Sequence, residues 1–201
     1  PELKDDYKDM EGACEECIYG YNIFRFAPST FSPLSSSSAP ESYILGPGDK
    51  LEISYYGSNE ELIESYLSRA GIINLPLLGP MNLAGLSLQE AIQNIRNKVK
   101  NQLIGTDVSV SLIELRTIKV YLLGEAYKPG LYTLSPLSNV TNALFVSGGV
   151  NEQGSLRNIE IKRNNQIIAK YDFYDFLLRG SLVSDLALQN GDVIFIPFIE
   201  N

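Results

Sequence analysis

A chain of 201 residues is long enough to bury the core of one large domain or of two small ones. Its 16 basic and 24 acidic residues give a net charge of −8, with no basic cluster to bind nucleic acid. Histidine is absent, which excludes Ser-His-Asp and Cys-His catalysis and removes a common metal ligand. No stretch approaches the roughly 20 apolar residues of a membrane-spanning helix, and no signal peptide is evident. We therefore expect no cofactor, no metal and no membrane-spanning segment in these residues.

Residues 1–42 are predicted to be a leader and linker, because they carry 8 acidic and 3 basic residues and end in a Ser/Pro-rich stretch. Aromatic side chains within "IYGYNIFRFAP" could pack either on the chain's own body or on a neighbouring subunit. Cys14 and Cys17 are expected to form a local disulfide or to remain free thiols, since no other Cys or His completes a zinc site.

The body of the chain is predicted to start near Tyr43 with a half-buried strand, because Leu51, Ile53 and Tyr55 alternate with polar residues. The segment 71–80, "GIINLPLLGP", favours a short hairpin. A helix should follow, opened by a capping box of Ser87 and Glu90 and ended near Gly105. Its apolar residues recur at helical spacing on one face, namely Leu88, Ala91, Ile92, Ile95 and Val99.

The second half of the chain alternates short strands with small helices. After a strand in "TDVSVSLIEL", the residues 116–134 predict two strands joined by a turn that includes Gly130. A short helix should begin at Ser138 or Asn139 and end at Gly148 and Gly149. A hairpin turning at Asn164-Asn165, a short helix closed by Gly180 and a last strand ending at Pro197 complete the order. This order predicts an α+β fold of two small domains, divided near Leu115.

Two segments are nearly the same, "ILGPGDKLEIS" and "ALQNGDVIFIP". Each places a glycine before an acid, Gly48-Asp49 and Gly191-Asp192, and then runs into a strand. A phosphate-binding loop would instead open onto a helix and would avoid a carboxylate. We therefore interpret both as turns, with the glycines at positive φ and the acids capping the turn through their side chains.

Several segments together resemble a known family. "YILGPGDKLEISYYG" and "GIINLPLLGPMNLAGLSLQEA" resemble the polysaccharide biosynthesis/export domain of Wza-type outer-membrane export proteins. "VYLLGEAYKPGLYTL", "NALFVSGGV", "GSLRNIEIKR" and "LQNGDVIFIP" resemble the SLBB (soluble-ligand-binding β-grasp) domain that follows it. The resemblance implies an export domain at residues 43–116 and an SLBB domain at residues 117–198.

The same resemblance implies a function without catalysis. Capsular or exopolysaccharide would pass through a homo-oligomeric ring from the periplasm to the cell surface of a Gram-negative bacterium. The implied partner is an inner-membrane polysaccharide co-polymerase, often a tyrosine kinase. The family's lipidated cysteine is not matched by Cys14, which has no apolar segment before it, and no C-terminal amphipathic helix is present. We therefore expect these residues to be a soluble fragment of a larger member.

The alternative function is a soluble module that binds a glycan or another small ligand in a β-grasp groove. Two sets of residues are candidate sites. Carboxylate pairs that could act in a glycosidase are Glu60 with Glu61 and Asp172 with Asp175, although neighbouring acids are more often caps or solvated faces. Tyrosines that could contact a glycan or a neighbouring subunit are Tyr55, Tyr56, Tyr121 and Tyr132.

Overall fold

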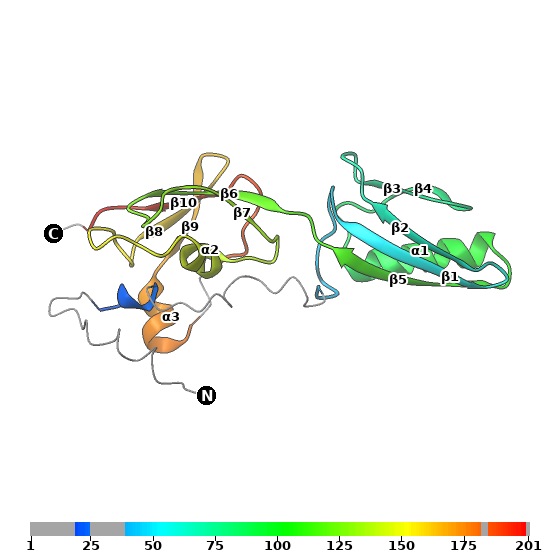
Figure 1. Ribbon diagram of the computed structural model, residues 1–201, viewed down its shortest axis with the longest axis horizontal. Coiled ribbons are helices and arrows are strands. Elements are labelled where there is room, and N and C mark those ends of the chain that lie inside the picture. Colours follow the sequence, from blue (N-terminus) through cyan, green and yellow to red (C-terminus); the bar gives the residue numbers. More distant parts are fainter. Residues whose placement is uncertain (1–18, 25–38, 182–184, 200–201) are drawn as a thin grey trace, which may run out of the picture. The chain divides into compact units, whose positions relative to one another are not determined.

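The computed structural model describes residues 19–24, 39–181 and 185–199, and it divides into two compact units (Figure 1). The first unit is built mainly from residues 39–119. The second is built mainly from residues 120–199, together with residues 19–24 near the start of the chain. Both units combine small sheets with few helices, which confirms the predicted α+β fold of two small domains.

The first unit is a three-stranded sheet, a separate hairpin and one helix. Its elements are β1 (Lys50–Gly57), β2 (Glu61–Tyr66), β3 (Ile72–Leu75), β4 (Gly79–Asn82), α1 (Leu88–Gln102) and β5 (Thr106–Glu114). β1 lies between β2 and β5 and is antiparallel to both, while β3 pairs with β4. Leu51, Ile53 and Tyr55 of β1 are buried, as their alternation predicts.

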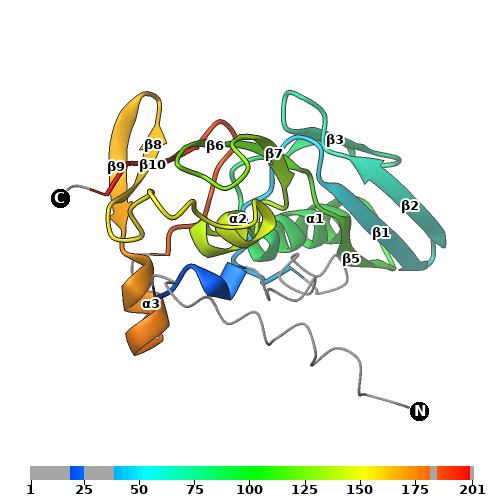
Figure 2. The ribbon, with the colours of Figure 1, turned by 60° about the vertical axis from the view of Figure 1, so that its left-hand side comes forward.

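Helix α1 covers the inner face of this sheet (Figure 2). The predicted capping box is present, because Ser87 Oγ accepts a 3.2 Å bond from the Glu90 amide and Ser87 N donates to Glu90 Oε2 at 2.8 Å. The buried face of the helix comprises Leu88, Ala91, Ile95 and Val99. Burial of each large aliphatic side chain contributes about 1.5–3 kcal/mol before entropy costs.

The sequence analysis missed strand β2. Glu61 is the first residue of this strand and pairs with Tyr55. The strand lies at the sheet edge, and Ile63 is its only apolar residue that is partly buried against the core. An edge strand buries too little apolar surface to give the alternation that identifies β1.

In its described residues, the second unit is a five-stranded mixed sheet with three short helical elements. The strands are β6 (Ile118–Gly124), β7 (Gly130–Leu134), β8 (Ile159–Arg163), β9 (Gln166–Tyr171) and β10 (Val193–Ile196). The helical elements are the 3-10 helix η2 (Asn22–Phe24) and the α-helices α2 (Val140–Val146) and α3 (Phe173–Arg179). The sheet order is β7-β6-β10-β8-β9, and β10 is parallel to β6 but antiparallel to β8.

The turns and caps of the second unit follow the sequence closely. Asn139 rather than Ser138 is the N-cap of α2, and its side chain accepts a 2.8 Å bond from the Asn142 amide. Asn164 and Asn165 both have positive φ, 50° and 64°, as a tight hairpin turn requires. Gly180 adopts the left-handed conformation that closes α3.

The aromatic N-terminal segment, residues 19–24, packs on the second unit of its own chain, and both views place η2 beside α3 (Figures 1 and 2). The Phe24 ring lies 5.0 Å from that of Phe173 and 5.3 Å from that of Phe145, centroid to centroid. The Tyr21 hydroxyl donates to the Gly154 carbonyl oxygen. Of the two alternatives left open by the sequence, the structure therefore has the segment on its own body.

Candidate functional site

The first Gly-Asp turn surrounds a fully buried carboxylate. Gly48 has a φ of 97°, as predicted, and Asp49 has 0% exposure. Asp49 Oδ2 accepts a 2.8 Å bond from the Gly46 amide, which closes the turn, and a 2.6 Å bond from Arg116 Nη1. Asp49 Oδ1 accepts from the Arg116 amide at 2.8 Å and from the Tyr43 hydroxyl at 2.9 Å. Burial and the adjacent Asp49 charge raise the pKa of Tyr43, so this hydroxyl remains a donor.

The second Gly-Asp turn repeats this arrangement. Gly191 has a φ of 88°, and Asp192 has 0% exposure. Asp192 Oδ2 accepts a 2.7 Å bond from the Gln189 amide. Arg163 forms a fork, with Nε bonded to Oδ1 and Nη2 bonded to Oδ2, each at 2.8 Å. Paired with a guanidinium and fully bonded, both carboxylates are parts of the fold rather than open ligand sites.

The prediction that both glycines have positive φ is confirmed, and both acids cap their turns as expected. The sequence patterns did not reveal the partners Tyr43, Arg116 and Arg163, and the two arginines are brought to the acids by strand pairing. Among the other predicted turn glycines, Gly148 and Gly149 have φ values of 83° and 94°. Gly130 begins β7, so it lies at the end of its turn.

The four tyrosines considered for glycan or subunit contact lie in different surroundings. Tyr55 is 2% exposed in the core of the first unit, so its ring presents no binding surface there. Tyr56 and Tyr121 are exposed, at 49% and 42%. Tyr132 is half-buried and donates a 2.6 Å bond to the Lys128 carbonyl oxygen. Only Tyr56 and Tyr121 therefore offer large ring surfaces, and they belong to different units.

The candidate carboxylates make structural contacts. Asp172 is the N-cap of α3 and accepts a 2.9 Å bond from the Tyr174 amide, while Asp175 pairs with Arg179 at 3.1 Å. Within the described ranges, no group of three or more Cys, Asp or Glu side chains could hold a metal ion. Cys14 and Cys17 lie outside those ranges. Asp172 and Asp175 thus serve as a cap and as an ion-pair partner within α3.

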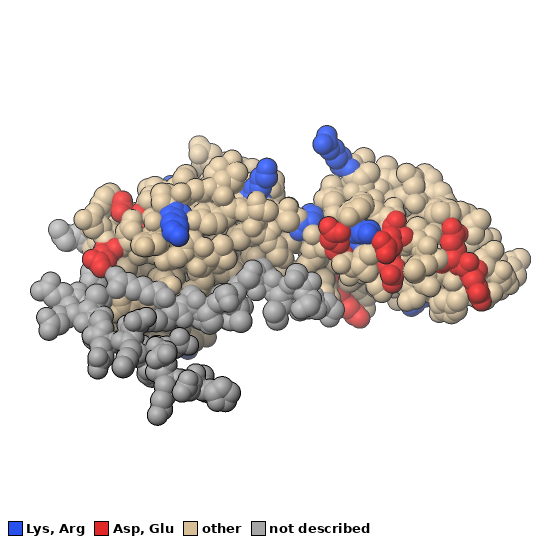
Figure 3. All heavy atoms as spheres, viewed as in Figure 1, with Lys and Arg blue, Asp and Glu red and all other residues tan. Residues whose placement is uncertain are grey.

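Exposed acids are concentrated on the first unit. The edge strands β2 and β5 carry Glu61, Glu64, Asp107 and Glu114 in exposed positions. Figure 3 shows acidic side chains gathered on the visible face of this unit. Such a face repels polyanions.

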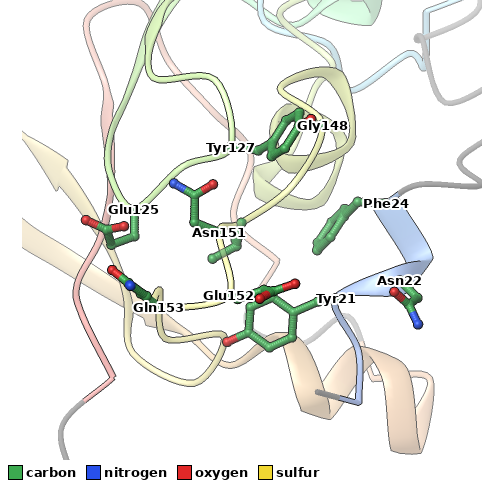
Figure 4. Close-up of a pocket in the computed structure, with 10 residues that line it drawn as sticks. Tyr21, Asn22, Phe24, Glu125, Tyr127, Gly148, Asn151, Glu152 and Gln153 are labelled. Atoms are coloured by element: carbon green, nitrogen blue, oxygen red, sulfur yellow. The ribbon is translucent and has the colours of Figure 1, made fainter. Parts of the chain in front are cut away.

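A pocket of about 730 Å³ lies within the second unit, and the sequence analysis did not find it (Figure 4). It is formed by three segments, the N-terminal segment, the loop after β6 and the loop after α2. Its polar and aromatic lining includes Tyr21, Asn22, Glu125, Tyr127, Asn151 and Glu152. Segments so far apart in the chain give no shared local pattern from which the pocket could be predicted.

Backbone bonds hold the two loops of the pocket together. The Tyr127 amide donates to the Gly149 carbonyl oxygen, and the Asn151 amide donates to that of Glu125, both at 2.9 Å. Asn151 Nδ2 also bonds to the Ala126 carbonyl oxygen at 3.2 Å. The pocket is therefore preformed by main-chain pairing, including the isolated bridge between Ala126 and Val150.

The N-terminal segment closes another side of the pocket. A Cβ added at Gly149 would overlap the Phe24 ring, so a glycine is required where this ring lies. Burial and the nearby Tyr174 raise the pKa of Tyr21 to about 12, which keeps its hydroxyl protonated at neutral pH. Tyr21 and Phe24 are thus fixed parts of the wall.

In the part of the chain that the structure describes, none of the helices is both long and apolar enough to span a membrane.

Comparison with known proteins places these features in a family. Residues 37–113 match the family described as polysaccharide biosynthesis/export protein. Two Escherichia coli proteins named polysialic acid transport protein KpsD are each 35% identical to this chain over 158 residues. The alignments cover 77% of this chain but only 28% of each relative, so the chain spans somewhat more than a quarter of their length.

Proposed function

We propose, from the premise that this chain belongs to the polysaccharide biosynthesis/export protein family, that it forms the periplasmic part of an outer-membrane export channel. The channel would conduct capsular polysaccharide or exopolysaccharide to the surface of a Gram-negative bacterium. It would do so as an oligomeric ring and without catalysing a reaction.

The observation that carries this proposal is the length of the similarity to the KpsD transport proteins. An alignment over 158 of 201 residues necessarily includes residues of both units. The relatives therefore share more than the residues 37–113 that match the export family. We infer that both units contribute to export, residues 43–116 as the export domain and residues 117–198 as an SLBB domain.

The absence of catalysis is supported by the contacts of the acidic residues. Asp49 and Asp192 are neutralised by arginines, and Asp172 and Asp175 cap or pair within α3. A carboxylate that holds a turn together is not available to protonate a glycosidic oxygen. The relatives are also named as transport proteins.

Assembly would use surfaces outside these turns. Tyr56 and Tyr121 are exposed aromatic side chains on strands, a residue type enriched at protein interfaces. We propose that subunits of the ring contact one another through such faces, and that an inner-membrane polysaccharide co-polymerase meets the periplasmic end. A permissive, polar lumen would let the polymer move without being held.

The experiment that tests this function is an in-frame deletion of the full-length gene. Polysaccharide is then quantified separately at the cell surface and in the periplasm, with a strain complemented by the intact gene as the control. Loss from the surface, with polymer retained inside or its synthesis stalled, is expected. Normal surface polysaccharide in the deletion strain would overturn the proposal.

A further inference from the structure

The first unit has two layers, a sheet and a helix, and each layer has an outer face. α1 packs on the core side of the β2-β1-β5 sheet through four buried side chains, Leu88, Ala91, Ile95 and Val99. Successive side chains of a strand point to opposite faces of its sheet. The residues that alternate with the buried Leu51, Ile53 and Tyr55 of β1 therefore face away from α1. The outer face of the sheet and the outer face of the helix thus lie on opposite sides of the unit.

Large side chains remain exposed on the outer face of the sheet, here called the sheet face. Tyr56 of β1 is 49% exposed, and Leu62 and Tyr66 of β2 are 62% and 53% exposed. Strand register places Leu62 opposite Ser54 and Tyr66 opposite Lys50, which puts these side chains on one face with Tyr56. Because aromatic residues are enriched at protein interfaces, this face suits contact with another protein surface.

The sheet face also holds a repulsive pair of acids. Glu52 of β1 lies directly opposite Glu64 of β2, and like charges in such positions destabilise a sheet. Lys50 Nζ bonds to Glu64 at 2.6 Å, so Glu64 is partly neutralised. The Glu52 carboxylate has no hydrogen bond or ion pair with any described residue. A cation brought by a partner would relieve the repulsion between the two acids.

The outer face of α1, here called the helix face, carries such cations. Its side chains recur at helical spacing and are amides or cations, namely Gln89, Gln93, Arg96, Asn97 and Lys100. Arg96 and Lys100 lie one turn apart, and neither side chain makes a hydrogen bond or ion pair within the described residues. The nearby acid Glu90 already bonds to Ser87 in the capping box. The helix face therefore complements the sheet face in charge.

We propose that the sheet face of one copy of this chain docks on the helix face of the next copy. Arg96 and Lys100 of the next copy then neutralise Glu52 and Glu64. The inference rests on the proposed function, in which copies form a ring, and it adds which two surfaces meet. Two sheet faces would instead bring like charges together. Because the two faces differ and lie on opposite sides of the unit, each added copy leaves one free face of each kind, and such contacts form a ring when the rotation between copies closes.

The test is sedimentation velocity of the 201-residue chain over a concentration series. We expect self-association that increases with concentration and weakens as salt is added. Glu52→Lys and Lys100→Glu should each weaken it about tenfold or more, because each places like charges against one another. The double variant restores one opposite-charge pair and should associate more tightly than either single variant. A double variant no tighter than the single ones, or an intact chain that stays monomeric throughout the series, would overturn the proposal.

Matched variants separate the contact from the fold. Arg69→Glu reverses a charge at an exposed position of the turn between β2 and β3, outside both faces, and should leave association unchanged. Glu52→Lys replaces a repulsive pair with an attractive one, so in dilute solution its melting temperature should not fall. Weaker association without a lower melting temperature assigns Glu52 to the contact. If Glu52→Lys does melt lower, Lys100→Glu, at an exposed position of α1, decides instead, and unchanged association of that variant would contradict the proposal.

The sedimentation experiment and the gene deletion fail separately. If charge reversal leaves association unchanged but the deletion abolishes surface polysaccharide, only the contact between the sheet face and the helix face is lost. If charge reversal acts as expected but the deletion leaves surface polysaccharide normal, the copies assemble as proposed and the export function is lost.

Discussion

The two Gly-Asp turns solve one structural problem with different partners. In each turn, the acid directly precedes a strand. The arginine that binds this acid lies at, or just beyond, the C-terminal end of the neighbouring antiparallel strand. Lys50 of β1 pairs with Glu114 of β5, close to Arg116, and Val193 of β10 pairs with Lys162 of β8, next to Arg163. The local turn is therefore set by sequence, whereas the arginine is brought to it by strand register.

The difference lies in how each arginine meets its acid. Arg116 uses one nitrogen, Nη1, which also bonds to the Tyr43 hydroxyl at 2.7 Å, and its amide adds a further bond to Asp49. Arg163 instead forms a planar fork with both oxygens of Asp192. The first turn thus depends on a network of several groups, and the second on one bidentate pair.

Removal of the acids should have the largest effect. Asp49→Ala and Asp192→Ala each leave an arginine without its buried partner, and about 3–5 kcal/mol of unfolding free energy should be lost. Asp49→Ala should cost more, because it also leaves the Gly46 and Arg116 amides and the Tyr43 hydroxyl without an acceptor. Native-state hydrogen exchange, followed residue by residue, measures the loss in each unit separately. A larger loss for Asp192→Ala would contradict the network interpretation.

Replacement of the turn glycines should have the next largest effect. Gly48→Val and Gly191→Val place a β-branched residue at positive φ, at a cost of about 1–3 kcal/mol each. The cost should be greater at Gly48, since an added Cβ would lie 3.3 Å from Arg116 Cβ, whereas that at Gly191 meets nothing within 4 Å. Thermal melting followed by circular dichroism measures both. Unchanged melting curves for both variants would show that neither turn needs its glycine.

Replacement of each arginine by lysine tests whether the bidentate pair of Arg163 contributes more stability than the single side-chain bond from Arg116 to Asp49. Arg163→Lys cannot form both bonds to Asp192 and should lose about 1–2 kcal/mol. Arg116→Lys keeps a single ammonium near Asp49 Oδ2 and should lose less. Urea unfolding of the two variants, with Arg179→Lys at an exposed ion pair as the control, gives the comparison. A greater loss of unfolding free energy in Arg116→Lys than in Arg163→Lys would contradict the greater importance of the bidentate pair.

The smallest effect should come from replacing a further acid of the second unit, Asp185. Asp185 accepts a 3.1 Å bond from the Thr141 amide, and burial raises the pKa of its carboxyl. Because the folded pKa is above the unfolded value of about 4, the contribution of Asp185 to stability is complete below pH 4 and declines as pH rises through the folded pKa. Asp185→Asn should flatten this decline. Melting temperatures of both proteins between pH 3.5 and 7 test it, and parallel curves would exclude a contribution from Asp185.

Much of the fold follows from local patterns in the sequence. Ser87 and Glu90 predict the start of α1, and Asn164-Asn165 predicts the β8-β9 turn, because each depends on neighbouring residues alone. β2 could not be predicted in the same way, since an edge strand buries little apolar surface. Sequence patterns therefore predict caps and turns, which depend on neighbouring residues, but they do not predict strands at the edges of sheets.

The pocket and the arginine partners were missed for a related reason. Glu125 and Asn151 are 26 positions apart, and Tyr21 is more than 100 positions from either. No local preference reports that these residues share a cavity, because only the pairing of loops and the packing of Phe24 bring them together. Tyr55 is the converse case, since its alternation with Leu51 and Ile53 already predicts that it is buried.

The packing of the N-terminal segment has a consequence for the order in which the chain folds. The hydrogen bond from Tyr21 to Gly154 spans 133 positions, and that from Tyr174 to Tyr19 spans 155, with the whole first unit between them. Closing such long loops costs conformational entropy. The contacts of residues 19–24 can offset this cost only after the surface of the second unit on which they pack has formed. We expect the second unit to form first with an open aromatic groove, into which the earliest described residues settle last.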